Sequence, residues 1–423
     1  MGRRSAAAGG LTPGGSAATL ERAWRDEWGR LLALLVARFR DLEIAEDALA
    51  GAFEAAARTW PRDGVPDNPP AWLLTTARHR ALDRLRSKQS ADRALPMLIA
   101  EHAATTGPAK EPGDDELRLL LLTCHPALAP ESQAALALRL VLGLPTAEIA
   151  RLFLISEATM AARITRAKKK IATAGLPFAI PDEDLLPARV ETAARAIYLC
   201  FTAGYAPGNG ADVVRRDLAG EAIRLARVLE SLLSRRSDAR PVVRALLALM
   251  LLQHSRRDAR VDADGALVLL ADQDRGRWHL DEIEEALALL RPLPPADGYA
   301  EELRQQAVIA ARHAIAVHPD DTDWPAIAHD YLGLERLTGS PVVRLNRAVA
   351  VAEADGPRAG LTLLEGLDEL LPRSHRLPAV RAELLTRAGR PAEASAELTR
   401  AIELCRNELE LAHLRARLAA LSG

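Results

Sequence analysis

One stretch, residues 144–171 with the sequence LPTAEIARLFLISEATMAARITRAKKKI, constrains the fold of this chain more than any other. Its apolar residues recur at helical spacing on both sides of a short break, which predicts two short helices joined by a tight turn. The first helix is expected to open at Thr146, with the threonine hydroxyl as its cap, and to end near Phe153. Ser156 is expected to cap the second helix, which begins at Glu157.

The second helix of this stretch has two unlike faces. An apolar stripe at spacings of four, three and four is formed by Met160, Ile164, Ala167 and Ile171. The opposite, polar and basic face is formed by Thr159, Arg163, Arg166 and Lys170. No acidic residue occurs between Ala158 and Pro181, so nothing on this helix opposes the attraction of an anion.

These features predict a helix-turn-helix that binds DNA, with polar groups at the front of the second helix and cations behind them. The residues predicted to lie near base edges are Ser156, Glu157, Thr159 and Met160. The residues predicted to contact phosphates are Arg163, Arg166, Lys168, Lys169 and Lys170. Taken without its neighbours, the second helix could equally be a solvated amphipathic helix with a basic end.

The remaining sequence favours helices over strands. Hydrophobic residues make up 49% of the chain but aromatic residues only 4%, and few β-branched residues are available to build sheets. We therefore predict an all-α protein with two small helical domains, the second a helix-turn-helix, followed by a helical repeat domain. At 423 residues the chain can form two to four domains, and its net charge of -2 means that a nucleic-acid partner has to be argued from local clusters.

The chain carries no clear targeting signal. Residues 1–19 are rich in Gly, Ala and Ser, lack an apolar core, and are expected to be a disordered extension. No apolar run approaches the roughly 18 residues that a membrane span needs. The cysteines Cys124, Cys200 and Cys405 are far apart in the sequence, which indicates a reducing compartment. We expect a soluble, cytoplasmic protein.

Three further helices are predicted in the first domain, residues 20–90. They cover residues 20–40, 43–60 and 71–88, and the prolines of residues 61–70 predict a loop before the third. The second helix should expose the acidic side chains of Glu43, Glu46, Asp47 and Glu54. The third helix is basic, and a polar linker, residues 91–113, separates it from the helix-turn-helix domain at residues 114–176.

Several of these segments resemble a known family. Ala45-Glu46-Asp47 with Phe53 and Trp60, the run from Trp72 to Arg78 with Asp83-Arg84, and the terminal helix-turn-helix are similar to extracytoplasmic-function (ECF) RNA polymerase sigma factors. The stretches LTCHPALAP, DADGALVLLADQDRGRW and DTDWPAIAHDYLGLERLTGSPVVRLNRAVAVAEADGP resemble the subgroup with a long helical extension of tetratricopeptide-like repeats. Two places depart from the family pattern, Ala50-Gly51 in the second helix and Thr202-Ala203-Gly204-Tyr205.

The resemblance implies two partners, core RNA polymerase and promoter DNA, and assigns residues to them. Those implied to contact polymerase are Glu43, Glu46, Asp47, Phe53 and Glu54. Those implied to contact the minus-ten element are Asn68, Trp72, Thr76, Arg78, His79, Arg80, Arg84, Arg86 and Lys88. The helix-turn-helix would then recognise the minus-thirty-five element.

Residues 177–423 are predicted to form a helical extension. Helices are expected from Val190 to Phe201, from Leu218 to Leu233 and from Pro241 to Leu252. The later prolines Pro325, Pro357 and Pro391 each sit near the start of a helical run, at separations that match paired-helix repeats. Such a repeat array would regulate the protein or bind a protein partner along its concave surface, and a purely structural stack is the alternative.

No arrangement typical of an enzyme or a cofactor site stands out. Cys124-His125 has no second pair of ligands nearby in the sequence, and phosphate-binding glycine loops and HExxH are absent. We therefore expect no catalysis, no cofactor and no metal. The rival functional hypothesis is a one-component regulator with a helix-turn-helix and a sensor or partner-binding repeat domain.

Overall fold

The computed structural model describes residues 13–91, 113–153, 155–205, 212–233, 237–260, 262, 268–406 and 408–422. Across these residues the regular elements are all helices, and none is a strand, which confirms the all-α prediction. The chain divides into two compact units. The first comprises residues 1–196 with 231–234, and the second comprises residues 197–230 with 235–423.

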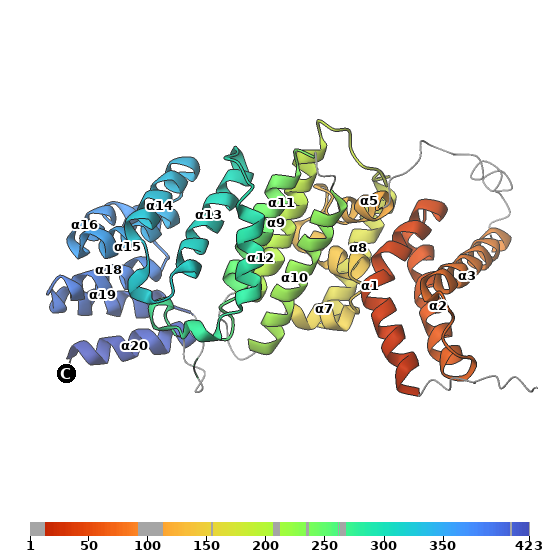
Figure 1. Ribbon diagram of the computed structural model, residues 1–423, viewed down its shortest axis with the longest axis horizontal. Coiled ribbons are helices and arrows are strands. Elements are labelled where there is room, and N and C mark those ends of the chain that lie inside the picture. Colours follow the sequence, from red (N-terminus) through yellow and green to blue (C-terminus); the bar gives the residue numbers. More distant parts are fainter. Residues whose placement is uncertain are drawn as a thin grey trace, which may run out of the picture. The chain divides into compact units, whose positions relative to one another are not determined.

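The first unit opens with three helices, α1 (Pro13–Phe39), α2 (Leu42–Asp63) and α3 (Pro69–Ala91), which pack on one another (Figure 1). The start of α1 corrects one expectation, because residues 13–19 are helical and not part of a disordered extension. Proline at the first helical position has a backbone already suited to a helix, and the alanines that follow favour helix. Residues 1–12 lie outside the described part of the chain.

Helix α2 also differs from the expectation at its end. It continues through Pro61 to Asp63, although a loop was predicted from Pro61 onward. Proline in the last turn removes only the hydrogen bond of its own missing N–H, so the turn is completed around it. Gly64, with φ of 88°, ends the helix and donates its N–H to the Trp60 carbonyl at 3.1 Å. At the other end, the Asp41 carboxylate caps α2 by accepting from the N–H groups of Glu43 and Ile44.

Aromatic side chains fill the contact between these helices. The ring centroid of Trp24 lies 4.4 Å from that of Trp28 and 4.8 Å from that of Phe53. The Trp60 and Trp72 rings meet edge to face at 5.7 Å, which joins α2 to α3. Large aromatic surfaces of this kind contribute much of the burial free energy of a small helical domain.

A second group of helices completes the first unit. It comprises α5 (Asp114–Thr123), α6 (Pro130–Leu136), a π-helical turn η1 (Ala137–Val141), α7 (Thr146–Leu152) and α8 (Glu157–Thr173). The first half of α9 (Leu186–Tyr205) belongs to the same unit, and Arg189 Nη2 donates to the Leu121 carbonyl at 2.9 Å. The first unit therefore extends past the predicted domain end at residue 176.

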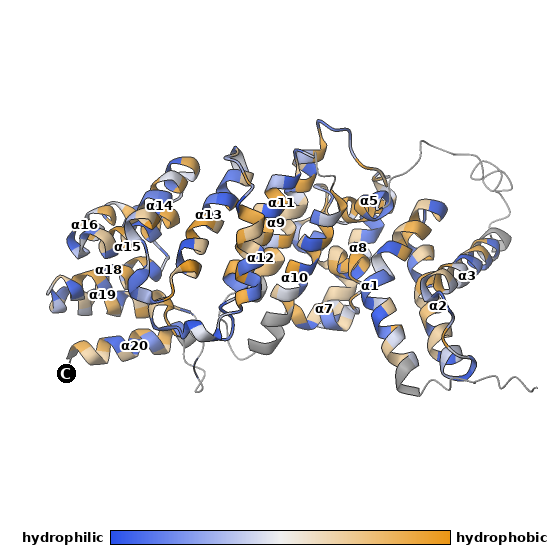
Figure 2. Ribbon diagram, viewed as in Figure 1, coloured by the Kyte–Doolittle hydropathy of each residue, from blue (hydrophilic) through white to orange (hydrophobic). Residues whose placement is uncertain are grey.

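The second unit is a succession of helices, and hydrophobic and hydrophilic residues alternate along most of them (Figure 2). The longer ones are α10 (Asp212–Leu232), α11 (Arg240–His254), α12 (Leu280–Leu290), α13 (Gly298–Ile315), α14 (Trp324–Thr338), α15 (Pro341–Asp355), α16 (Pro357–Leu363), α18 (Arg376–Arg387), α19 (Pro391–Leu404) and α20 (Glu408–Ser422). Shorter turns are η2 (Leu270–Asp272), η3 (Arg275–Arg277), η4 (Pro319–Asp321) and α17 (Leu367–Leu370). The predicted helices over residues 190–201 and 241–252 are confirmed as parts of α9 and α11, and the one predicted over residues 218–233 lies in α10, which ends one residue earlier.

Proline marks helix starts in this unit as the sequence indicates. Pro325 is the second residue of α14, and Pro357 and Pro391 open α16 and α19. The clearest helix pair is α18 with α19, where Gly389, with φ of 74°, makes the turn between them. Leu385 of α18 and Leu398 and Ala401 of α19 are buried in one apolar cluster, which holds this pair together.

Candidate nucleic-acid interface

The two helices predicted to bind DNA, α7 and α8, are present and packed against each other. Ser156 caps α8 as predicted, because its Oγ accepts from the Thr159 N–H at 3.2 Å. The predicted cap on α7 is wrong: Thr146 is already helical, and Pro145, which has no polar side chain, precedes the helix. The first turn of α7 is closed instead by the Ile149 N–H, which donates to the Pro145 carbonyl at 3.0 Å. Leu154, in the predicted turn, lies outside the described residues.

The apolar stripe of α8 packs inward as predicted. Its four residues, Met160, Ile164, Ala167 and Ile171, are all buried. The complete burial of Met160, at 0% exposure, corrects its placement near base edges. One side chain cannot both fill the core and reach into a groove, so Met160 drops out of the proposed base-contacting set.

The front of α8 keeps three polar residues at the surface. Ser156, Glu157 and Thr159 are exposed, and the Ser156 and Thr159 hydroxyl oxygens lie 2.7 Å apart. The Ser156 and Thr159 hydroxyls are therefore engaged with each other, which leaves the Glu157 carboxylate as the group best placed to meet a partner. This set remains a prediction for base recognition.

The cations of α8 do not have equal access to solvent. Arg166, Lys169 and Lys170 are exposed, and Arg163 is half-buried. The Arg166 Nε donates to the Ala162 carbonyl one turn earlier at 3.1 Å, and the Lys170 Nζ donates to the Ala127 carbonyl. Lys168 is the exception, because its ammonium is engaged by the carboxylate of Glu46 on α2.

Glu46 is the centre of a buried charge cluster, which corrects its predicted place on an exposed acidic surface. It is 4% exposed, and its Oε1 accepts from Arg139 Nε at 2.7 Å while its Oε2 faces Lys168. Arg139 also donates to the Leu144 carbonyl at 3.1 Å. A carboxylate removed from water needs such partners, since losing one leaves an uncompensated buried charge.

The other residues implied to contact polymerase differ in exposure. Glu43, Asp47 and Glu54 lie at the surface of α2, and Asp47 pairs with Arg84 of α3 at 2.7 Å. Phe53 is buried in the aromatic cluster with Trp24 and Trp28, so in this conformation it serves the core and is not available to a partner.

Helix α3 carries most of the residues implied to contact the minus-ten element. Asn68 caps it, because its Oδ1 accepts from the Ala71 N–H at 3.1 Å. The exposed members are Asn68, Arg78, His79, Arg80, Arg84 and Arg86, and the half-buried members are Trp72 and Thr76. Arg86 pairs with Asp83 at 3.4 Å. Lys88 lies in α3, but its side chain is outside the described part of the structure.

The structure gives a reason for the glycine at residue 51. A Cβ built on Gly51 would lie 2.9 Å from the Arg80 Nη1, so the absence of a side chain lets the guanidinium group of α3 lie against α2. Glycine costs roughly 1 kcal/mol relative to alanine inside a helix, and here it makes room for this approach.

A direct contact between the two helical groups of the first unit was not foreseen from the sequence. Helix α1 packs against α5 and η1, and the Trp24 Nε1 donates to the Gly143 carbonyl at 3.1 Å. Two glycines permit this approach. A Cβ on Gly29 would meet the Val141 carbonyl oxygen at 2.4 Å, and one on Gly143 would meet the Trp28 ring at 2.7 Å.

Gly143→Ala is expected to destabilise the folded protein by about 2 kcal/mol or more. The substitution adds overpacking against Trp28 to the strain of a positive φ, here 74°. Gly175→Ala is the matched control, because Gly175 also has a positive φ, 58°, but no atom within 4 Å of its added Cβ. Chemical denaturation of both variants should show the larger loss for Gly143→Ala; equal losses would mean that the contact with Trp28 contributes nothing.

Opposite charges line the cleft between the two helical groups. The cleft has a volume of about 970 Å³, with Asp41, Glu43 and Asp47 on one side and Lys168 and Lys169 on the other. Glu46 and Lys168 also line this cleft, and their ion pair joins the two helical groups and engages a cation that a DNA partner would need.

A second carboxylate lies at the contact of α1 with α5. Burial raises the pKa of Glu116, the positive charge of Arg30 lowers it, and the negative charge of Glu27 raises it further. The raised pKa means that Glu116 binds a proton more tightly in the folded protein than in the unfolded chain. Protonation of Glu116 therefore stabilises the folded protein increasingly as the pH falls toward the ordinary pKa range of a carboxyl group.

Comparison with known families identifies both helical groups. The model for sigma-70 region 2 matches residues 25–91, and the model for sigma-70 region 4 matches residues 118–171. Residues 189–293 match a family of unknown function, DUF6596. The chain therefore has the two regions with which sigma-70 proteins bind core RNA polymerase and promoter DNA and take part in transcription initiation.

A relative is similar in sequence over nearly the whole chain. An uncharacterized protein of Rhizobium meliloti (strain 1021) is 44% identical over 407 residues, which cover 93% of each chain. The chain therefore belongs to the same family as this rhizobial protein. No solved structure matches it. The described helices include none that is both long and apolar enough to cross a membrane.

Proposed function

We propose that this protein is a sigma factor of the ECF type, which binds core RNA polymerase and directs it to promoters. The observation that carries the proposal is the presence in one chain of region 2 and region 4, each with an exposed basic helix, α3 and α8. In this proposal α3 contacts the separated strand of the minus-ten element, and α8 contacts the minus-thirty-five duplex.

The two regions have to separate for this function. The two promoter elements lie about 25 base pairs apart, which is about 85 Å of B-DNA at 3.4 Å per base pair. In the structure Trp24 of region 2 hydrogen-bonds Gly143 of region 4 directly. Residues 92–112 join the two regions, and a chain of this length reaches at most about 75 Å when extended. That reach, added to the dimensions of the domains, is sufficient to span both elements, so we infer that the packed arrangement is a closed state.

Binding to bacterial core RNA polymerase tests the proposal. Purified full-length protein should form a stable complex with core polymerase and allow it to initiate from promoter fragments. Promoter fragments recovered by selection from a random library provide the template, since the recognised sequence is not fixed by the structure. A chain that binds duplex DNA but never associates with polymerase would instead be a one-component regulator.

We further propose that the helical C-terminal domain regulates the sigma regions. A cavity of about 470 Å³ in the second unit supports this, because its size falls in the range of small-molecule sites. It is lined by Trp324 and by His313 and Tyr331, which are both neutral near pH 7. Burial and the nearby charges of Arg256 and Arg275 lower the pKa of His313 to about 4, and burial raises that of Tyr331 to about 12.

A truncation that tests this regulation should retain all of α9. Val190, Ala193 and Ala194 of that helix are buried, and its residues up to 196 belong to the first unit, so ending the chain near residue 180 would expose the core of region 4. A chain that ends after Tyr205 should raise or lower promoter-directed transcription by a factor of about ten or more. A coupling free energy of about 1.4 kcal/mol between the C-terminal domain and the sigma regions produces a change of that size. Unchanged transcription on every selected promoter would remove the regulatory role. We propose no catalytic activity for either unit.

A further inference from the structure

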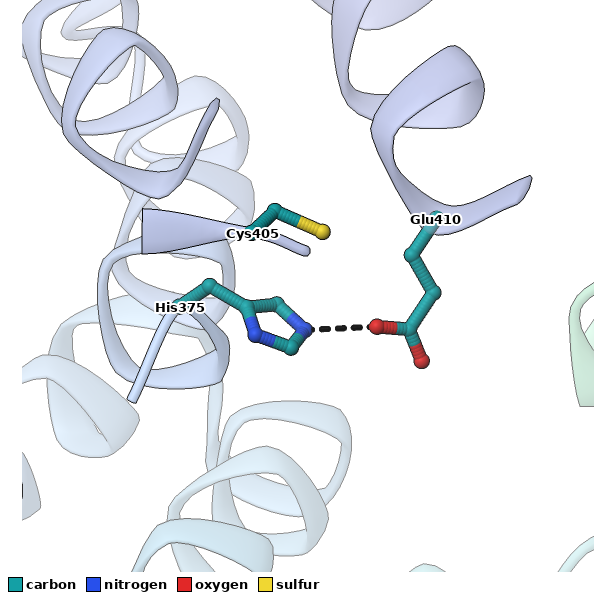
Figure 3. A group of neighbouring side chains, drawn as sticks. All are labelled: His375, Cys405 and Glu410. Carbon is teal, nitrogen blue, oxygen red and sulfur yellow. Dashed lines mark ion pairs between the residues drawn. The ribbon is translucent and has the colours of Figure 1, made fainter. Parts of the chain in front are cut away.

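Three side chains that commonly bind transition metals converge at the end of the second unit (Figure 3). His375 directly precedes α18, Cys405 directly follows α19, and Glu410 lies in the first turn of α20. A ring nitrogen of His375, the Cys405 sulfur and a carboxylate oxygen of Glu410 all lie within 4.8 Å of one another. The His375 Nε2 is 2.6 Å from the Glu410 Oε2.

The surrounding fold fixes these three side chains from different directions. Cys405 is buried in the apolar cluster that also contains Leu398 and Leu414, which holds the thiol at the base of the group. His375 and Glu410 are partly exposed, with side-chain exposures of 23% and 18%. Figure 3 shows the sulfur and the imidazole ring projecting from one side and the carboxylate facing them from α20. The group therefore combines a buried sulfur with an imidazole and a carboxylate that are partly exposed to solvent.

We propose that His375, Cys405 and Glu410 form a binding site for a zinc-class divalent ion. Zinc binds sulfur at about 2.3 Å and nitrogen or oxygen at about 2.0–2.2 Å, so tetrahedral ligand atoms lie about 3.3–3.6 Å apart. The present separations bracket these values, with one pair at 2.6 Å and all pairs under 4.8 Å. Changes of about 1.2 Å or less in these separations, within the reach of side-chain rotation, bring all three atoms to the spacing of tetrahedral ligands.

The chemistry of the three ligands selects the class of metal. A thiolate with an imidazole favours zinc and related transition metals over magnesium and calcium, which prefer oxygen ligands. Three protein ligands leave a fourth position for water or an external ligand. A simple ion pair between His375 and Glu410 is the alternative explanation, and Arg376 approaches the second Glu410 oxygen at 3.8 Å. That ion pair does not require a thiol, whereas the metal site uses all three side chains.

The site would tie the last helix of the chain to the rest of the second unit. His375 and Cys405 belong to the ends of the α18 and α19 pair, and Glu410 belongs to α20. A bound ion would therefore join α20 to that pair through bonds much stronger than its apolar contacts alone. Docking of α20 is then controlled by metal supply and by the redox state of the Cys405 sulfur, because only the thiolate binds metal.

Cobalt titration of the metal-stripped full-length protein tests the site, since cobalt accepts the same ligands as zinc and a cobalt–thiolate bond gives a charge-transfer absorption. We expect a single cobalt ion per chain with that absorption, and a higher unfolding temperature in zinc. Cys405→Ser should lose the absorption. Glu410→Gln and His375→Gln keep the thiol and should bind more than about tenfold more weakly.

Cys200→Ala is the matched control, because Cys200 is also a buried cysteine on a helix but has no such neighbours among the described metal-binding residues. It should bind cobalt as the unaltered protein does. The proposal is overturned if the full-length protein takes up no cobalt, if the absorption persists in Cys405→Ser, or if it disappears in Cys200→Ala. Should Cys405→Ser fail to fold, unchanged affinity in both Glu410→Gln and His375→Gln would overturn it equally.

Discussion

Replacing Glu46 by Gln is expected to open the contact between region 2 and region 4. The Glu46 carboxylate is buried between Arg139 and Lys168, and within the described part of the chain it is the acidic partner of both in their ion pairs. Removing one member of a buried ion pair costs about 3–5 kcal/mol, because the remaining charges stay out of water without compensation. In this protein, Arg139 and Lys168 can become hydrated again when the two regions separate. The cost of leaving them unpaired is therefore relieved by opening of the contact and does not require global unfolding.

The distance between the regions measures this opening. Fluorescent or spin labels at Arg58→Cys on α2 and Thr173→Cys on α8 occupy exposed positions, and the three native cysteines are buried. The unaltered protein should give one short distance. Glu46→Gln should give a broad distribution of longer distances, up to about 75 Å of linker added to the dimensions of the two domains.

Asp47→Asn is the matched control for this experiment. Asp47 is the next residue on α2 and also forms an ion pair, but its partner Arg84 is exposed and belongs to region 2. An exposed pair contributes at most about 1 kcal/mol and does not join the two regions. A short distance that persists in Glu46→Gln, or an equal opening in Asp47→Asn, would show that Glu46 does not hold the closed state.

Opening should also increase the affinity of region 4 for DNA. Lys168 is bound to Glu46 in the closed state and becomes available to phosphates when that bond is lost. In the closed state, DNA binding has to overcome the free energy of the contact between the regions. For each 1.4 kcal/mol by which Glu46→Gln weakens that contact, the affinity for DNA should rise about tenfold. Duplex binding is the suitable readout for this variant, since Glu46 lies among the residues implied to contact polymerase.

The local features of the helix-turn-helix were predictable because their causes lie within a few residues. The Ser156 cap depends on the N–H three positions later, and the stripe from Met160 to Ile171 depends on helical periodicity. The same local logic failed at Thr146, where both Pro145 and Thr146 were compatible with the start of a helix.

The burial of Glu46 could not be predicted in the same way. On the helix alone Glu46 lies among Glu43, Asp47 and Glu54, and all four have the pattern of an exposed acidic face. Its partners Arg139 and Lys168 are 93 and 122 residues away in the sequence, so its exposure depends on tertiary packing. Met160 is the opposite case, in which the local pattern gave the correct answer. Its place in the apolar stripe predicted burial, which the structure confirms, whereas its position near the start of the helix wrongly predicted contact with DNA.

Neutralising two cations of α8 is expected to change how strongly salt affects DNA binding. Arg163 and Lys169 project from α8 without the ion pair that engages Lys168, so Arg163→Ala with Lys169→Ala removes two phosphate contacts and leaves the Glu46 cluster intact. Each phosphate contact releases counterions, which gives a slope of about -0.9 per contact in a plot of log affinity against log salt. The double variant should therefore have a slope about 1.8 units shallower than that of the unaltered protein, with a similar loss for every duplex sequence.

The control for this experiment preserves the change in net charge but moves it elsewhere. Arg336→Ala with Arg373→Ala removes two exposed cations from the second unit. A general effect of protein charge would change both double variants alike, whereas direct phosphate contacts change only the α8 variant. An unchanged slope in the α8 variant would show that α8 does not lie along the DNA backbone, and α3 would then be the remaining basic helix able to account for duplex binding.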